Sequence, residues 1–143
     1  MFPTWDSDLF QLINQAHVSW LDEPMVIISG KLIWIPLYAF LIYLLYEKSK
    51  IHVWKSILYL TSTVIFADQV SSSILKPLFK RLRPCHVEGF QSWIHLPDGC
   101  GGLYGFCSSH SANAFAVAIG FYLVTKNKPI GLLLLIWATL IAY

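Results

Sequence analysis

The residues of this chain that could do chemistry are a group of basic side chains and a later serine–histidine segment. Lys76, Lys80, Arg81 and Arg83 lie within eight residues, and His110 stands at the start of a later apolar run. Cationic side chains beside lipid are costly and tend to be functional. Ammonium and guanidinium groups suit the oxygens of an anion. We therefore predict a site for an anionic, phosphorylated group at a membrane face.

The spacing of the outermost two cations suggests a helix. Arg83 comes seven residues after Lys76, which is nearly two turns of α-helix. Pro77 suits a first helical turn and Pro84 suits a stop. We expect one helix to carry both cations on one face, with their side chains converging on one phosphate. A basic loop that pairs with lipid headgroups explains the charges equally well.

The serine–histidine segment is expected to begin a helix. Ser108, Ser109 and His110 precede an apolar run, and serine is favoured as an N-cap. The unpaired N–H groups of a first helical turn form an anion site. We expect His110 to contact the same anion as Lys76 and Arg83 and to donate a proton to a leaving oxygen. A solvated histidine at a helix end is the alternative.

An acidic residue, Asp68, lies inside an apolar run about two helical turns before Lys76. A carboxylate inside a membrane segment is a functional candidate by default. A structural role, in which Asp68 accepts hydrogen bonds from nearby hydroxyl or indole groups, explains it equally well.

Three cysteines, Cys85, Cys100 and Cys107, lie in the polar region between apolar runs. A loop that faces an oxidising compartment permits one disulfide. We expect Cys85 to pair with Cys100, because Cys107 adjoins the proposed site. Three free thiols are the alternative. A zinc site that also uses His86 or His95 is weaker, because the spacings match no ligand pattern.

The elements that must position these residues follow from the composition. Of 143 residues, 56% are hydrophobic and 13% are charged, whereas soluble domains carry roughly 25% charged residues. This predicts an all-α, multi-span transmembrane helical bundle in a single domain, 1–143. The expected elements are an interfacial helix at 7–20, membrane helices at 25–46, 54–75, 111–124 and 129–143, and a polar loop at 76–110. A first helix that packs on the protein itself is the alternative to an interfacial one.

Short basic loops predict the orientation in a cell membrane. The lysines that mark the cytoplasmic side are Lys48, Lys50, Lys55, Lys126 and Lys128. The 76–110 loop and the N-terminus then face the periplasm or the extracellular side. A net charge of +2 is too small to indicate a nucleic-acid partner.

Two of these segments resemble the signatures of the type 2 phosphatidic acid phosphatase family of membrane phosphatases. The first signature, a lysine, six residues and Arg-Pro, matches residues 76–84 without a gap. The second, Pro-Ser-Gly-His, appears at 107–110 as Cys-Ser-Ser-His. The third, Ser-Arg, five residues, His, three residues and Asp, is not found, and the sequence stops at Tyr143 where it would begin. We therefore expect a C-terminally truncated domain that is inactive alone.

The resemblance implies metal-independent hydrolysis without a cofactor, through a phosphohistidine formed on a histidine of the third signature. It implies that Lys76 and Arg83 hold the phosphate oxygens, that Ser108 and Ser109 donate hydrogen bonds, and that His110 protonates the leaving group. The implied substrate is a lipid phosphate or diphosphate at the outer membrane face. Undecaprenyl diphosphate is the preferred candidate, and phosphatidic acid, phosphatidylglycerol phosphate and lipid A phosphates are alternatives.

Three other classes of protein are alternatives to a phosphatase. A non-catalytic membrane protein that binds anionic lipid headgroups would keep the cations and lose the chemistry. The related vanadate-dependent haloperoxidases share the phosphate pocket. They are soluble proteins, whereas the composition of this chain is typical of a membrane protein. A transporter is disfavoured, because the polar residues gather at one face and not at mid-membrane.

Overall fold

The computed structural model describes residues 4–30 and 32–142. Its helices are α1 Thr4–Gln15, α2 Asp22–Ser29, α3 Ile35–Lys48, α4 Val53–Gln69, α5 Lys76–Phe79, α6 Ser109–Thr125 and α7 Lys128–Ala142. Shorter turns are the 3₁₀ segments η1 Ser19–Leu21, η2 Leu32–Trp34 and η4 Pro84–His86, and the π-helical segment η3 Val70–Leu75. The described residues contain no strand, and the predicted all-α class is confirmed.

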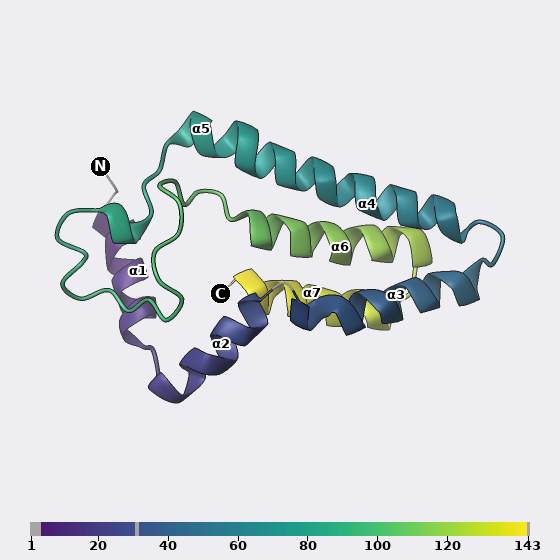
Figure 1. The fold of residues 1–143 in the computed structure, drawn as a ribbon, viewed down its shortest axis with the longest axis horizontal. Helices are drawn as coiled ribbons and strands as arrows, with labels where there is room; N and C mark the ends of the chain where they lie inside the picture. Colours follow the sequence, from purple (N-terminus) through teal and green to yellow (C-terminus); the bar gives the residue numbers. More distant parts are fainter. Residues whose placement is uncertain (1–3, 31, 143) are drawn as a thin grey trace.

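The long helices lie side by side, and the loop between α5 and α6 gathers with α1 at one end of them (Figure 1). The core lies where α3, α6 and α7 meet. Its buried side chains are Leu41, Leu45, Ala114, Ala118, Phe121, Leu134, Trp137 and Ala138. Several are alanines, which let helices approach closely because little side chain separates the backbones.

Two glycines bring α6 close to its neighbours on either side. A Cβ atom on Gly120 of α6 would lie 2.8 Å from a methyl carbon of Leu60 in α4. A Cβ on Gly131 of α7 would lie 3.0 Å from the ring of Tyr122 in α6. Helix α6 is therefore held between α4 and α7, and the position of its first turn is fixed by packing along its length.

The first two predicted segments have different bounds in the structure. The helix expected at 7–20 spans Thr4–Gln15, and η1 follows after a break. The segment expected as one span at 25–46 is divided, because Gly30 ends α2 in an extended conformation and Pro36 lies in the first turn of α3. Proline lacks the N–H that a continuing helix needs, so it favours a new start.

The later predicted segments all fall on helices. Residues 54–75 lie in α4 and η3, residues 111–124 lie in α6, and residues 129–142 lie in α7. Tyr143 is outside the described residues. Within the described part of the chain, none of the helices taken singly has both the length and the apolar character needed to cross a membrane. One pair bent by 69°, Ser19–Ser29 with Leu32–Lys48, meets both criteria when taken together.

Candidate active site

The start of α5 and the start of α6 meet through Lys76 and Ser109. The Nζ atom of Lys76 donates to Oγ of Ser109 at 3.0 Å. Ser108 is the N-cap of α6, and its Oγ accepts the N–H of Ser111 at 3.4 Å. The first N–H groups of a helix are positively polarised. The ammonium group of Lys76 and the N-terminus of α6 therefore lie next to each other, and an anion can bind between them.

The π-helical segment explains how Lys76 reaches α6. The backbone N–H of Lys76 bonds to the carbonyl of Ser71, five residues earlier. In an α-helix five residues make about 1.4 turns, so the two side chains would point apart. The wider π turn places both on the side that faces α6. Ser71 is 1% exposed and its Oγ lies 3.1 Å from that of Ser109.

Arg83 does not lie on the helix of Lys76, and the prediction that one helix carries both is wrong. Helix α5 ends at Phe79, and Lys80 adopts a left-handed conformation with φ of 45°. The chain beyond Lys80 then pairs with residues 103–105. The N–H of Arg83 bonds to the carbonyl of Leu103 at 2.9 Å. This backbone pairing replaces the hydrogen bonds that a longer helix would have supplied.

The side chain of Arg83 lies along two glycines of the facing segment, Gly101 and Gly105. A Cβ on Gly101 would be 2.8 Å from Cζ of Arg83, and a Cβ on Gly105 would be 3.1 Å from its Cγ. The Nε–H of Arg83 donates to the carbonyl of Tyr104 at 3.4 Å. Both glycines thus make room for the arginine. The convergence of Arg83 with Lys76 on one phosphate stays a prediction.

His110 lines a cavity of about 340 Å³ beside the start of α6. The polar residues of its wall are Ser29, Asp68, Ser109, His110 and Asn113, and its aromatic residues are Trp34, Tyr38 and Trp137. The His110 side chain is exposed. A largely apolar pocket with a few polar groups is the usual form of a ligand site.

Asp68 ties α4 to α6. Its Oδ1 accepts the Nδ2 amide of Asn113 at 3.0 Å. Its backbone carbonyl accepts the hydroxyl groups of Ser71 at 3.0 Å and Ser72 at 2.6 Å. These contacts support the structural explanation of Asp68. Sequence reasoning missed Ser71 and Asn113, because nothing in the apolar pattern marks the π turn that aligns them.

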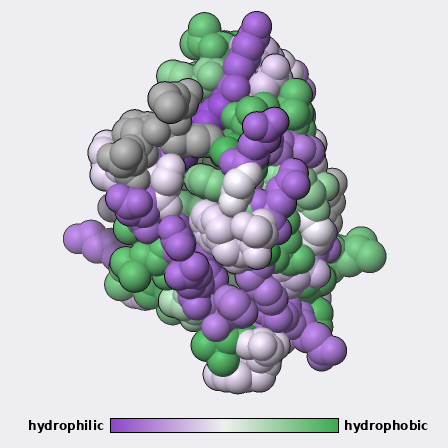
Figure 2. Space-filling view, turned by 90° about the vertical axis from the view of Figure 1, so that its left-hand side faces the viewer, coloured by the Kyte–Doolittle hydropathy of each residue, from purple (hydrophilic) through white to green (hydrophobic). Residues whose placement is uncertain are grey.

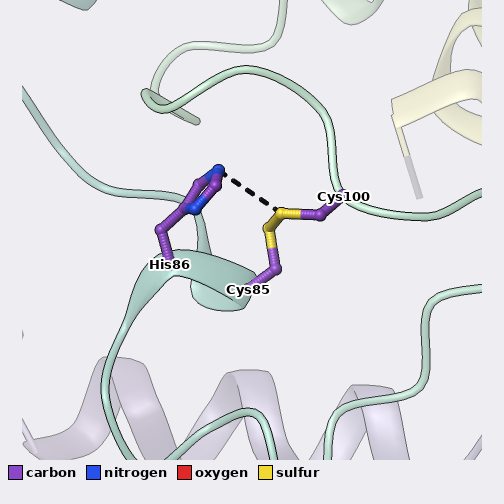
Figure 3. Close-up of side chains that lie close together, drawn as sticks. All are labelled: Cys85, His86 and Cys100. Carbon is purple, nitrogen blue, oxygen red and sulfur yellow. Dashed lines mark hydrogen bonds between the residues drawn. A yellow bond between two sulfur atoms is a disulfide. The ribbon is translucent and has the colours of Figure 1, made fainter.

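The loop that carries Arg83 contains a disulfide between Cys85 and Cys100 (Figure 3). Their Cα atoms are 6.0 Å apart, and Cys107 is a free thiol. The ring of His86 lies 3.4 Å from Sγ of Cys100. Sulfur atoms joined to each other are not thiolate ligands. The zinc alternative at these residues is therefore not supported.

Helix α1 packs on this loop, as in the alternative to an interfacial helix. Asp6 pairs with Arg81 at 2.6 Å. The side chain of Asn14 bonds to both the carbonyl and the N–H of His95, at 2.9 Å and 2.8 Å, and the ring of His95 contacts the carboxylate of Asp22 at 3.0 Å. Figure 2 looks onto this end, where hydrophilic side chains run across the middle and hydrophobic ones lie toward the margins.

Lys76, Lys80, Arg81 and Arg83 form the basic cluster, and its two central residues lie at a different surface from Lys76. Lys80 and Arg81 line an open cavity of about 790 Å³ between α1 and the loop, together with aromatic residues that include Trp5, Phe79 and Phe106. The basic cluster is therefore divided, with Lys76 turned toward α6 and the central pair toward α1.

The part of the sequence that holds both signature segments matches a known family. A family model described as the PAP2 superfamily matches residues 52–143, which include α4 to α7 and the two signatures. The chain belongs to this superfamily, that of the type 2 phosphatidic acid phosphatases.

Two curated relatives share the name lipid A 4'-phosphatase. One, from Bacteroides thetaiotaomicron, is 33% identical over 139 residues, which cover 93% of this chain and 60% of the relative. The other, from Porphyromonas gingivalis, is 33% identical over 129 residues, which cover 86% of this chain and 53% of the relative. The chain thus spans little more than half the length of these relatives. No solved structure matches it.

Proposed function

We propose that the protein hydrolyses the phosphate ester of a membrane lipid, with the phosphate bound between Lys76 and the first turn of α6. The observation that carries this proposal is the 3.0 Å contact between the ammonium of Lys76 and Ser109 at the start of that helix. It joins the two signature segments in space although 33 residues separate these positions in sequence. Preorganised positive charge is most of what phosphoryl transfer requires of a protein.

In the proposed reaction a histidine attacks phosphorus, and the alcohol leaves with a proton supplied by His110. Water then releases inorganic phosphate from the phosphohistidine. Arg83 binds a further phosphate oxygen, and the hydroxyl group of Ser108 donates a hydrogen bond to the phosphate. The attacking histidine belongs to the family's third signature, which is not among these 143 residues. Turnover is therefore measured on the whole product of the gene.

We favour a lipid A phosphate as the substrate over the undecaprenyl diphosphate that the sequence analysis preferred. The support is that both curated relatives are named lipid A 4'-phosphatase. The cavity beside His110 has an aromatic wall that includes Trp34, Tyr38 and Trp137. This wall offers an apolar surface to the group that departs with the oxygen, so a bulky leaving alcohol fits there.

We place the protein across a membrane, with α1 and the loop at its outer face. Large apolar side chains are exposed around the bundle: Phe40, Ile42, Ile65, Phe66, Leu132, Leu133, Ile136 and Leu140. Exposed apolar surface of this extent needs a partner, and lipid is one. Lysines gather at the opposite end, as on a cytoplasmic side, and a disulfide in the loop suits an oxidising outer compartment.

The test is phosphate release from lipid A, undecaprenyl diphosphate and phosphatidic acid by the whole gene product in detergent. We expect lipid A to be the best substrate. Lys76→Ala and His110→Ala should each lower kcat/KM by about 100-fold or more, while the protein still binds anionic vesicles. Binding without release from any of these lipids would favour the non-catalytic lipid-binding alternative. Undiminished release by both variants would exclude the proposed roles.

A further inference from the structure

The side chain of Ser109 stands where the family's second signature has glycine, so its hydroxyl group is an addition to the common site. We propose that this hydroxyl positions Lys76 and does not bind the phosphate, and that Ser71 holds it in place. The proposal rests on the proposed function for the identity of the anion. The geometry that carries it is independent of that function.

Three contacts define the arrangement. Nζ of Lys76 lies 3.0 Å from Oγ of Ser109. Oγ of Ser109 lies 3.1 Å from Oγ of Ser71. Oγ of Ser71 lies 3.0 Å from the carbonyl oxygen of Asp68. Together they form one continuous chain of polar atoms from the ammonium group to the backbone of α4.

The protons in this chain can be assigned from the chemistry of the groups. A carbonyl oxygen only accepts, so a hydrogen bond from Ser71 to Asp68 uses the single hydroxyl proton of Ser71. Ser71 lies within donating distance of both the Asp68 carbonyl and Ser109 but has one proton. We therefore assign Ser109 as the donor to Ser71, which uses the single hydroxyl proton of Ser109, because the opposite direction would leave the contact between Ser71 and Asp68 without a proton. An ammonium group only donates, so Lys76 donates to Ser109. This is the arrangement that places a proton in each of the three contacts.

The hydroxyl of Ser109 consequently has no proton left for a phosphate. The donors that the helix start offers are backbone groups. The N–H of Ser111 bonds to the hydroxyl of Ser108, and the N–H of Ala112 bonds to its carbonyl. In the described part of the structure the N–H groups of Ser109 and His110 have no such partner. These two groups, together with Lys76, would bind the anion.

Burial makes the chain effective as a positioning device. Ser71 is 1% exposed, so water does not compete for its hydroxyl, and hydrogen bonds in a low dielectric are stronger than in water. The π turn brings Ser71 and Lys76 to the same side of the helix. Lys76 is therefore held at one end by its backbone and at the other by a hydroxyl that is itself anchored.

A measurement on Lys76 itself tests the chain without any need for turnover. The rate of acetylation of Lys76 by an amine-reactive ester is followed by peptide mass spectrometry, with exposed Lys80 as an internal reference. We expect Ser109→Ala and Ser71→Ala each to raise the rate at Lys76 about 3- to 10-fold, the factor that corresponds to one modest hydrogen bond.

Two further variants sharpen this measurement. Ser72→Ala is the matched control, because Ser72 donates to the same carbonyl of Asp68 at 2.6 Å but is not part of the chain to Ser109. It should leave the rate unchanged. Ser109→Thr keeps a hydroxyl and should restore the slow rate. Equal rates at Lys76 in the wild type, Ser109→Ala and Ser71→Ala would overturn the proposal.

Turnover of the whole gene product separates positioning from direct binding. A loosened Lys76 weakens phosphate binding in the ground and transition states alike, so Ser109→Ala should raise KM about 3- to 10-fold with little change in kcat. Ser71→Ala should match it, and the double variant should be no worse than either, because both act through one chain. A fall in kcat of about 100-fold for Ser109→Ala alone would show direct contact with the phosphoryl group and contradict the proposal.

The acetylation rates and the turnover measurements test the two proposals separately. If no lipid phosphate is hydrolysed but acetylation responds as expected, the proposed function is wrong and the positioning of Lys76 stands. If hydrolysis occurs but acetylation does not respond, the function stands and the role of Ser109 is wrong.

Discussion

The guanidinium group of Arg83 occupies space that the glycine at position 101 leaves open. A Cβ atom on Gly101 would lie 2.8 Å from Cζ of Arg83, which is too close for a carbon contact. The arginine is therefore placed by the absence of a side chain across the loop, as well as by its own backbone pairing with Leu103.

Replacing Gly101 by alanine should displace the guanidinium without unfolding the loop, because the tip of an arginine can move. We expect kcat/KM for the lipid phosphate to fall about 10-fold, since a small misplacement of a binding group costs much of its effect. Gly102→Ala is the control, because a Cβ there meets nothing within 4 Å. Equal activity of the two variants would show that Arg83 does not need its present position.

Reduction of the disulfide should destabilise the loop. Cys85 and Cys100 are 15 residues apart, and closing a loop of that size is worth about 3 kcal/mol in the chain-entropy picture. We expect a thiol reductant to lower the melting temperature of the purified protein in detergent. A Cys85→Ala/Cys100→Ala double variant should melt at the lower temperature and ignore the reductant. A wild-type protein that melts identically with and without reductant would contradict this.

Loss of the Asp68 carboxylate should destabilise the contact between α4 and α6. In Asp68→Ala the Nδ2 amide of the partly buried Asn113 loses its acceptor, and a donor without a partner costs about 1–3 kcal/mol when it is fully buried. Asp68→Asn, which retains one side-chain oxygen, should cost less. The measurement is thermal or denaturant unfolding in detergent. Gln69→Ala is the comparison, because Gln69 is exposed and its oxygen only accepts from Ser73. If Gln69→Ala lowers the stability to unfolding as much as Asp68→Ala does, the contact between Asp68 and Asn113 is not what stabilises the helix pair.

Truncation of Asn14 should release α1 from the loop. Its side chain makes two hydrogen bonds to the backbone of His95, so Asn14→Ala leaves both backbone groups unsatisfied. We expect faster amide hydrogen exchange and proteolysis in Thr4–Gln15, with the long helices unaffected. Gln15→Ala, at an exposed neighbouring position, should show neither change. Unaltered amide exchange in α1 of Asn14→Ala would mean that other contacts are enough to hold α1 on the loop.

Long apolar runs and a capping serine were readable from the sequence. The runs located α4, α6 and α7, because a buried helix needs such a stretch whatever its partners are. Serine before an apolar run is a reliable helix start, and Ser108 is the cap of α6. The family resemblance followed from spacing in two short segments, which the match over residues 52–143 supports.

Features that depend on backbone geometry were not readable. Lys80 in a left-handed conformation ends α5, and such a conformation is uncommon for any residue except glycine. The π turn before Lys76 leaves no mark in the apolar pattern. The docking of α1 rests on Asn14 and His95, which are 81 positions apart, and no local rule connects them.

The π-helical segment Val70–Leu75 has a consequence for how such proteins are recognised. Deleting one residue between Ser71 and Lys76 would restore ordinary α-helical spacing, with the two side chains four positions apart and still on one face. Inserting one residue there would leave every letter of both signatures intact but would turn the ammonium by about 100° around the helix axis, away from α6. A homologue with that insertion would pass any comparison of motifs, although its lysine would not face the start of α6. The length of this stretch of helix is therefore worth comparing alongside the signatures themselves.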